Sequence, residues 1–439
     1  MKCKTMKHGS IGLQCMMLAF VFAVCFTGCK DSKDETSEPY DPNQPVTVEG
    51  FMPVEGKLRE KVIVKGSNFG TDKSKVKVYF VDEAAERLST VIGIDNNTLY
   101  CLAPRQLPGG NRIKVIVDGK EVTTDGTFKY EQAQNVSTIT GAASKAGTDD
   151  GDLASAKLNY LWGIAAVGNN TVLVFHRQDK NPRVRLISVD DNKVTTVHPG
   201  FKGGKPAVTK DKQRVYDIGW DGTHTVYVYM KASGWAPTRI GQLGSTFSGK
   251  IAAAALDATE EWLYFLDSNK NFGRFNVKTQ EVELIKTLDL PGSLGATPGP
   301  YLVYYFVDGN FYMSDQNLSA VYKITPEGEC EWFCGSSTQK TVQDGLREEA
   351  SFAQPNGMTI DEDGNFYIVD GFGGHCLRKL DILDGYVSTV AGQVNVISQI
   401  DGTPLEATFN YPYDICYDGE GGYWIAEGWG CAVRKYAVE

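Results

Sequence analysis

Residues 360–370 have the sequence Ile-Asp-Glu-Asp-Gly-Asn-Phe-Tyr-Ile-Val-Asp, which predicts a strand, a tight turn and a second strand. Residues 417–427 repeat this pattern with the sequence Tyr-Asp-Gly-Glu-Gly-Gly-Tyr-Trp-Ile-Ala-Glu. A third strand follows each copy, at Leu377-Arg-Lys-Leu380 and at Val433-Arg-Lys-Tyr436. The two stretches therefore encode the same all-β unit.

A longer repeat surrounds this unit and occurs three times without a gap. It begins with Val136-Ser-Thr-Ile-Thr-Gly141, Cys330-Glu-Trp-Phe-Cys-Gly335 and Val387-Ser-Thr-Val-Ala-Gly392. Nine residues after each final glycine comes an Asp-Gly pair, and its aspartates are Asp150, Asp344 and Asp401. Internal repeats of this length indicate propeller blades or solenoid coils.

The spacing of the repeats predicts the number of blades. The first two copies are 194 residues apart and the last two are 57 apart, so four blades of about 48 residues fill the first interval. Six blades in total follow, with seven as the alternative. The copy at Val136 precedes the first blade, and the last blade ends after three strands. We therefore expect Val136 to Thr140 to supply the outer strand of the last blade and close the ring.

This repeat resembles the NHL repeat, a family that builds β-propellers. The match covers 355–390, 412–438 and, less closely, 158–198. The resemblance implies an NHL-type β-propeller over residues 136–439.

A smaller domain is expected before the propeller, at residues 46–131. Short runs with alternating apolar residues, separated by Gly, Asn, Asp and Pro, predict an antiparallel sandwich. The segments Gly66-Ser-Asn-Phe-Gly70, Ala103-Pro104, Gly109-Gly110 and Phe128-Lys-Tyr130 resemble an IPT/TIG domain, an immunoglobulin-like module. The resemblance implies a spacer that carries no catalytic residues.

The N-terminus is typical of an exported lipoprotein. Residues 1–28 combine three lysines with an apolar stretch from Ile11 to Phe26, as in a signal peptide. The stretch ends in Phe26-Thr-Gly-Cys29, which resembles a lipobox, and this implies lipidation of Cys29. Residues 29–45 are polar and contain prolines, which predicts a flexible tether. We expect a protein anchored by lipid to the outer membrane, facing the cell exterior.

The net charge and the absence of common catalytic motifs in the sequence disfavour several classes of function. Removing residues 1–28, which hold three lysines and no acid, changes the formal net charge from −10 to −13. Nucleic-acid binding needs the opposite sign. The chain has no H-E-x-x-H, G-x-S-x-G or Walker motif. We therefore predict no catalytic residue, no cofactor and no metal, and a binding protein rather than an enzyme.

The predicted ligand-binding face collects the loops that enter the inner strands and those between second and third strands. Phe372 and Trp429 lie there in equivalent loops flanked by glycines, so little surrounds either ring. Exposed rings beside carboxylates and amides suit an oligosaccharide. The predicted ligand contacts are Trp429, Phe372, Trp162, Tyr413, Tyr160, Asp370, Glu427 and Trp220. The alternative is that the rings pack between blades and that the acidic residues, as is common in NHL repeats, close loops by accepting from backbone amides.

The whole architecture resembles the accessory surface glycan-binding lipoproteins of gut-bacterial polysaccharide-uptake systems. This resemblance implies an oligosaccharide or polysaccharide ligand, with a peptide or glycoprotein as alternatives, and an outer-membrane uptake complex as partner. A second hypothesis is a metal-dependent propeller lyase or lactonase, and a third is a protein-interaction scaffold. The oxygen ligands for the second would be Asp315, Asp370, Asn356, Asp414 and Glu427.

Overall fold

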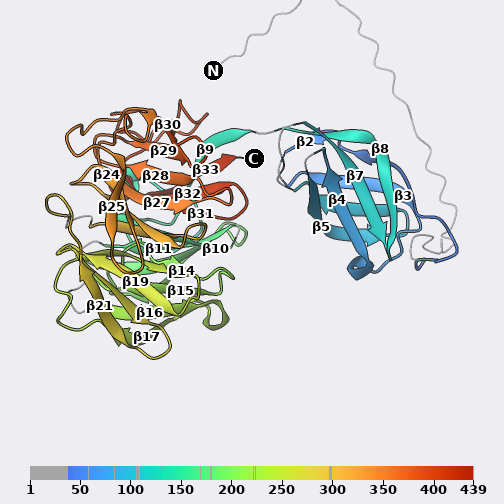
Figure 1. Cartoon of the computed structure of the whole chain (residues 1–439). Helices are drawn as coiled ribbons and strands as arrows, with labels where there is room; N and C mark the ends of the chain where they lie inside the picture. The colour runs from blue at the N-terminus through green and yellow to red at the C-terminus, as the bar shows by residue number, and fades with distance from the viewer. Residues whose placement is uncertain are drawn as a thin grey trace, which may run out of the picture.

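The computed structural model is all-β and contains two units, a sandwich and a propeller (Figure 1). The structure describes residues 38–438, apart from 58, 84, 105, 107–108, 132, 169, 178–179, 221, 223 and 296–298. The proposed signal peptide, Cys29 and most of the tether lie outside these residues. Within the described residues, no helix is long and apolar enough to cross a bilayer.

The first unit is an eight-stranded antiparallel sandwich with one short parallel pair, between β2 and β8. Its strands alternate between buried and exposed residues, as in Lys61–Ser67, where Val62 and Val64 are buried. Phe80 and Phe128 meet edge to face at 5.3 Å in its core. The strands are β1 (Thr47–Met52), β2 (Glu55–Gly56), β3 (Lys61–Ser67), β4 (Val76–Val81), β5 (Glu86–Asp95), β6 (Thr98–Leu102), β7 (Gly109–Val117) and β8 (Lys120–Tyr130).

The second unit is a six-bladed propeller, as the repeat spacing predicts. Blade 1 consists of β10 (Leu161–Gly168), β11 (Thr171–His176), β12 (Arg183–Ser188) and β13 (Lys193–Pro199). Blade 2 consists of β14 (Ala207–Val208), β15 (Arg214–Ile218), β16 (Thr225–Met230) and β17 (Pro237–Gln242). Blade 3 consists of β18 (Ile251–Leu256), β19 (Trp262–Asp267), β20 (Asn271–Asn276) and β21 (Val282–Thr287).

Blades 4 to 6 complete the ring. Blade 4 consists of β22 (Tyr301–Tyr305), β23 (Asn310–Asp315), β24 (Ala320–Ile324) and β25 (Cys330–Gly335). Blade 5 consists of β27 (Pro355–Ile360), β28 (Phe366–Asp370), β29 (Cys376–Asp381) and β30 (Tyr386–Ala391), with the short β26 (Gly345–Leu346) on the outside. Blade 6 consists of β31 (Pro412–Tyr417), β32 (Gly422–Glu427), β33 (Ala432–Val438) and β9 (Gln134–Gly141).

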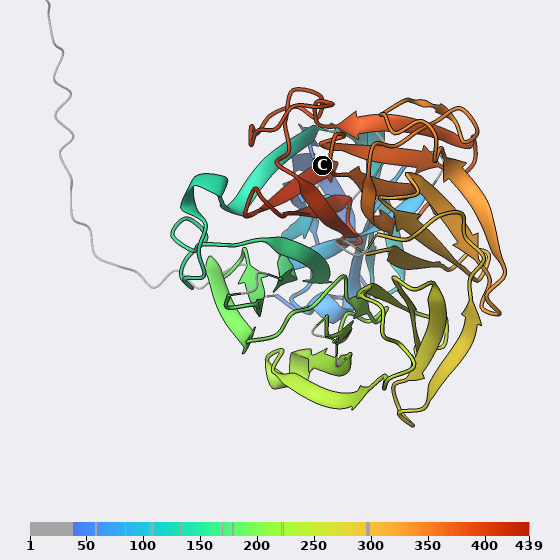
Figure 2. The same ribbon diagram turned by 90° about the vertical axis from the view of Figure 1, so that its left-hand side faces the viewer.

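The prediction that Val136 to Thr140 closes the ring is confirmed. The β9 strand pairs antiparallel with β33, with Val136 opposite Tyr436 and Thr140 opposite Val433. In Figure 2 the N-terminal strand of the propeller lies beside the C-terminal one. This arrangement gives the last blade its fourth strand and removes two unpaired sheet edges.

The repeated Asp-Gly pairs tie each outer strand to its blade. The carboxylate of Asp344 accepts from buried Arg378 at 2.9 Å, and from the backbone amide and hydroxyl of Thr389 at 3.1 and 3.0 Å. Blades 1 and 6 repeat this arrangement with Asp150, Arg185 and Thr196, and with Asp401, Arg434 and Thr138. The third strand thus supplies a buried guanidinium, the outer strand a threonine, and the loop the acid that joins them.

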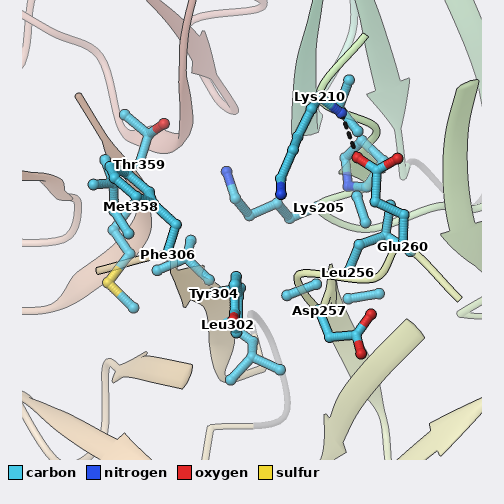
Figure 3. A pocket seen from close by; sticks show the side chains of 17 residues that line it. Lys205, Lys210, Leu256, Asp257, Glu260, Leu302, Tyr304, Phe306, Met358 and Thr359 are labelled. Atoms are coloured by element: carbon cyan, nitrogen blue, oxygen red, sulfur yellow. Dashed lines mark hydrogen bonds between the residues drawn. The ribbon is translucent and has the colours of Figure 1, made fainter. Parts of the chain in front are cut away.

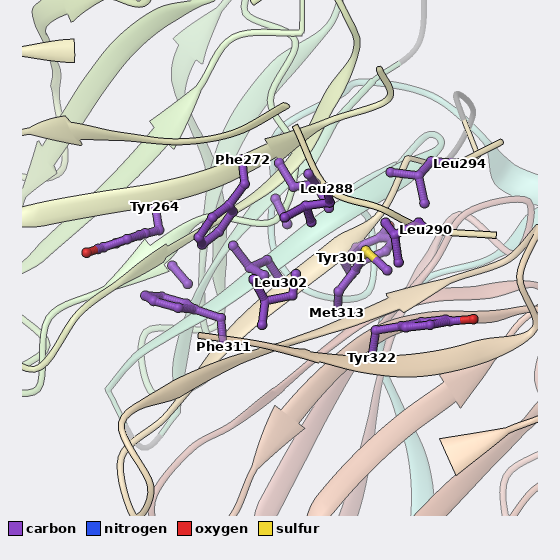
Figure 4. Close-up of a cluster of buried hydrophobic side chains, with 14 of the residues drawn as sticks. Tyr264, Phe272, Leu288, Leu290, Leu294, Tyr301, Leu302, Phe311, Met313 and Tyr322 are labelled. Atoms are coloured by element: carbon purple, nitrogen blue, oxygen red, sulfur yellow. The ribbon is translucent and has the colours of Figure 1, made fainter. Parts of the chain in front are cut away.

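Apolar side chains fill the space between neighbouring blades. Figure 4 shows the cluster between blades 3 and 4, where Tyr264, Phe272 and Phe311 meet with ring centroids 4.3–5.8 Å apart. Leu302 and Met313 extend this cluster along β22 and β23. Large buried rings let blades with little sequence repetition keep the same spacing.

An ion pair links the two units. Arg59 of the sandwich donates to Glu420 at 2.6 Å. Glu420 lies in the loop between β31 and β32, which is at the opposite end of blade 6 from the loop between β32 and β33. The sandwich therefore contacts one end of the propeller, and we call the other end the distal face. Figure 2 looks onto this distal face, with the sandwich behind the ring.

Candidate ligand-binding face

The distal face carries two exposed aromatic rings, as the flanking glycines predict. Trp429 is 53% exposed and Phe372 is 42% exposed. Tyr411 lies between them, with its ring centroid 4.5 Å from Phe372 and 6.3 Å from Trp429. Trp429 in turn lies 5.0 Å from Tyr160 in an edge-to-face contact. These four residues form one continuous surface over blades 5, 6 and 1, which we call the aromatic rim.

The backbone holds the two tyrosines of the rim in an unusual conformation. Tyr160 and Tyr411 have φ angles of +45° and +53°. Each is the last residue before an inner strand, so the two positions are equivalent in blades 1 and 6. Such left-handed conformations cost about 1–3 kcal/mol for a residue other than glycine and cluster at functional sites. The fold therefore repeats the same backbone conformation at these two positions of the rim.

A second aromatic layer lies beneath the rim. The rings of Trp162 and Tyr413 stack 5.3 Å apart at 15°, and only 2% and 3% of these residues are exposed. The guanidinium of Arg177 lies between Trp162 and Trp220, 3.6 and 3.1 Å from the two ring centroids. Trp162 and Tyr413, which the sequence predicts as ligand contacts, are therefore covered in this structure. They form the floor that supports Tyr160, which contacts both at 6.0 Å.

Asp370 and Glu427, two further predicted ligand contacts, are also buried. Asp370 accepts from the amides of Ala353 and Gln354, at 2.9 and 2.7 Å. Glu427 accepts from the amide of Asn410 at 2.9 Å. Burial raises the pKa of Asp370 to about 6 and that of Glu427 to about 7. The alternative interpretation, that Asp370 closes a loop by accepting from backbone amides, is confirmed, and Glu427 acts in the same way.

The same position at the end of the second strand shows how regular this device is. Asp217, Asp267 and Asp315 accept from the amides of Gly204, Gly249 and Gly295 that lead into the inner strands. Only blade 1 differs, with His176 at this place. Burial lowers the pKa of His176 to about 3, so its ring is neutral.

The acids proposed for a metal-dependent enzyme do not come together. Each of Asp315, Asp370 and Glu427 serves its own blade, and Asp414 accepts from the ammonium of Lys205 at 2.8 Å. Across the described part of the chain, no three His, Cys, Asp or Glu side chains are placed to hold a metal ion. Among the described residues, the four acids proposed for the lyase or lactonase hypothesis therefore do not form one group of metal ligands.

A cavity of about 280 Å³ opens at the opposite end of the central channel (Figure 3). The side chains of Lys205 and Lys210 project into it, facing an apolar wall that includes Tyr304, Phe306 and Met358. No sequence motif marks this cavity, because its walls come from four different blades, 2 to 5, and the repeat is weak in the first three of them. The ammonium of Lys205 is already held by Asp414 and the carbonyl of Ile415.

Comparison with known proteins agrees with this architecture. The IPT/TIG domain model matches residues 46–130, and the NHL repeat model matches residues 352–380. The chain is thus an IPT/TIG-bearing NHL propeller. It belongs to the same family as a structural genomics protein of unknown function from Bacteroides thetaiotaomicron. That protein is 90% identical, its alignment covers 92% of this chain and 100% of that one, and the TM-score is 0.78.

Two more distant structures share the complete two-unit fold. They are described as auxiliary nutrient binding proteins, from Bacteroides thetaiotaomicron and Bacteroides ovatus, and are 22% and 20% identical. Their alignments cover 91% and 92% of this chain, and 99% and 100% of theirs, each with a TM-score of 0.60. A curated relative, Protein SUPPRESSOR OF QUENCHING 1 of Arabidopsis thaliana, is 31% identical over 86 residues. Those residues are 19% of this chain and only 8% of that protein.

Proposed function

We propose that this protein is a non-enzymatic, lipid-anchored binding protein that recognises an oligosaccharide through its aromatic rim. The observation that carries the proposal is the exposure of Trp429 and Phe372 in a continuous line of four rings. A pyranose has an apolar face that stacks on such rings. Exposed large rings that are grouped rather than scattered mark interaction sites.

The floor under the rim supports binding without a large conformational change. Tyr160 rests on the stacked pair Trp162 and Tyr413, and Arg177 fills the space between Trp162 and Trp220. The loop of Trp429 is fixed in a similar way, because Gln399 donates to Glu427 at 2.6 Å and to the carbonyl of Gly430 at 2.9 Å. A binding face that is already formed loses little conformational entropy when a ligand binds.

The architecture also favours binding over catalysis. The two structures described as auxiliary nutrient binding proteins share the sandwich and the propeller over more than nine-tenths of the chain. A nutrient taken up by such a protein would be carried to an outer-membrane uptake complex, which we propose as its partner.

The proposed anchor and the position of the sandwich fit this role. Lipidation of Cys29 would place the tether and then the sandwich between the bilayer and the propeller. The contact between Arg59 and Glu420 is at the end opposite the rim, so the rim would face away from the outer membrane. This orientation suits a receptor that meets soluble polysaccharide outside the cell.

The test is affinity electrophoresis of residues 30–439 in gels that contain one soluble polysaccharide each. We expect at least one polysaccharide to retard the protein, and the double variant Trp429→Ala and Phe372→Ala to migrate as in a gel without polysaccharide. The matched control is Trp332→Ala, because Trp332 is 43% exposed but lies on the outer strand β25. Retardation that survives in the double variant would refute the proposed face.

A further inference from the structure

The floor of the distal face carries positive charge next to the rim. Lys250 places its ammonium 4.6 Å from the ring centroid of Trp220, and the Arg177 guanidinium lies on the same ring. Trp220 and Lys250 are both half-buried, so this charge is near the surface. The described residues give the Lys250 ammonium no ion-pair partner.

An unbroken series of ring contacts connects Lys250 with the rim. From Trp429 the series passes to Tyr160 at 5.0 Å, to Trp162 at 6.0 Å and to Trp220 at 6.3 Å. A ligand chain that stacks on Trp429 in blade 6 and extends past blades 1 and 2 therefore approaches Lys250, which lies directly before the inner strand of blade 3.

The nearest acids do not cancel this charge. Asp267 is buried next to Lys250, and its carboxylate accepts from the amides of Gly249, Asn269 and Asn271. Asp217 faces Arg177, and burial raises the pKa of Asp217 to about 8, so it is mostly neutral at pH 7. Both acids lie below the surface, while Lys250 reaches it.

We propose that the ligand is an acidic oligosaccharide, with a carboxylate or sulfate group that binds Lys250 while another sugar of the same chain stacks on the aromatic rim. This inference rests on the proposed function and names its ligand class. The net charge of −13 for the chain without residues 1–28 does not oppose it. Exposed charges more than about 8 Å apart are largely screened at physiological salt, so the local cations dominate.

The experiment uses matched acidic and neutral polysaccharides in the same affinity gels. Polygalacturonate, which carries only carboxylates, and dextran sulfate, which carries only sulfates, are the acidic probes. The first is paired with its neutral carboxyl-reduced derivative and the second with neutral dextran. The comparison of the two pairs separates a carboxylate ligand from a sulfate ligand. The variants are Lys250→Gln, the conservative Lys250→Arg, and the control Lys193→Gln. Lys193 is exposed at the other end of blade 1 and loses the same charge when substituted.

We expect an acidic probe to be retained and its neutral counterpart to be lost. Lys250→Gln should weaken binding about tenfold, the effect of one charged hydrogen bond, and reduce its salt dependence. Lys250→Arg should retain most of the affinity, and Lys193→Gln should bind like the wild type. Retention of neutral polymers alone, or acidic binding that Lys250→Gln leaves unchanged, would overturn this inference but leave the proposed function intact. If no polysaccharide retards the protein, both fall.

Discussion

Substitution of Asp401 by alanine tests how the ring is closed. Its carboxylate accepts from Arg434 at 2.8 Å, and from the hydroxyl and amide of Thr138 at 2.8 and 2.9 Å. Thr138 is on β9, the strand that closes the propeller, and Arg434 is on β33. The variant therefore loses a direct link between the first and last strands of the ring.

The size of the effect follows from these contacts. Two hydrogen bonds to neutral groups contribute about 1 kcal/mol each, and a charged one contributes about 1.5–3 kcal/mol. The Asp401 side chain is 49% exposed, so solvent screening places the charged contact at the low end. Arg434 keeps Glu427 at 3.0 Å and two backbone carbonyls. We expect Asp401→Ala to lower the free energy of unfolding by about 3 kcal/mol.

The assay is urea unfolding followed by tryptophan fluorescence, together with amide hydrogen exchange. Asp344→Ala is the matched control, because Asp344 makes the same contacts within blade 5. Both variants should lose stability, but only Asp401→Ala should speed exchange of the amides of β9. Equal exchange in β9 for the two variants, or a loss below about 0.5 kcal/mol, would refute this account of ring closure.

Three further predictions concern the floor, the pH dependence and the anchor. Arg177→Ala should lower the free energy of unfolding by about 3 kcal/mol, because Arg177 contacts two tryptophan rings and a desolvated cation–π contact contributes up to about 2 kcal/mol. The same variant should change tryptophan fluorescence. The control is Arg239→Ala, at an exposed site. Asp217 has a folded-state pKa of about 8, above its ordinary value of 3.8, so the folded state binds its proton more tightly. The protonated Asp217 side chain therefore contributes fully to the free energy of unfolding below about pH 4, and this contribution is lost as the pH rises to about 8. In Asp217→Asn, the free energy of unfolding measured by urea titration should change less between these two pH values. Cys29→Ser should move the protein from the membrane to the soluble fraction on cell fractionation, and wild-type behaviour of this variant would argue against lipidation.

The sequence predicted the parts of the structure that depend on local pattern. The copy at Val136 matched the outer strands of later blades, and this match placed the closing strand correctly. Glycines beside Phe372 and Trp429 correctly indicated exposed rings, since nothing local could cover them. The Asp-Gly pairs were found as a motif, although their partner arginines were not, because those side chains come from strands about 35 residues away.

Burial and charge on the distal face could not be predicted in the same way. Trp162 and Tyr413 stack on each other, and Arg177 lies over Trp162, so the covering side chains come from different strands and loops. Lys250 lies in a part of the chain where the repeat is weak, so no motif marks it. Its position becomes meaningful only when the fold brings it to Trp220.

A crystal structure of the protein with a retained oligosaccharide would test the central claim most directly. The account predicts sugar rings stacked on Trp429 and Phe372 at the distal face, with the floor of Trp162 and Tyr413 unmoved beneath them. An oligosaccharide bound instead in the channel cavity beside Lys205 and Phe306, with a bare rim, would contradict it.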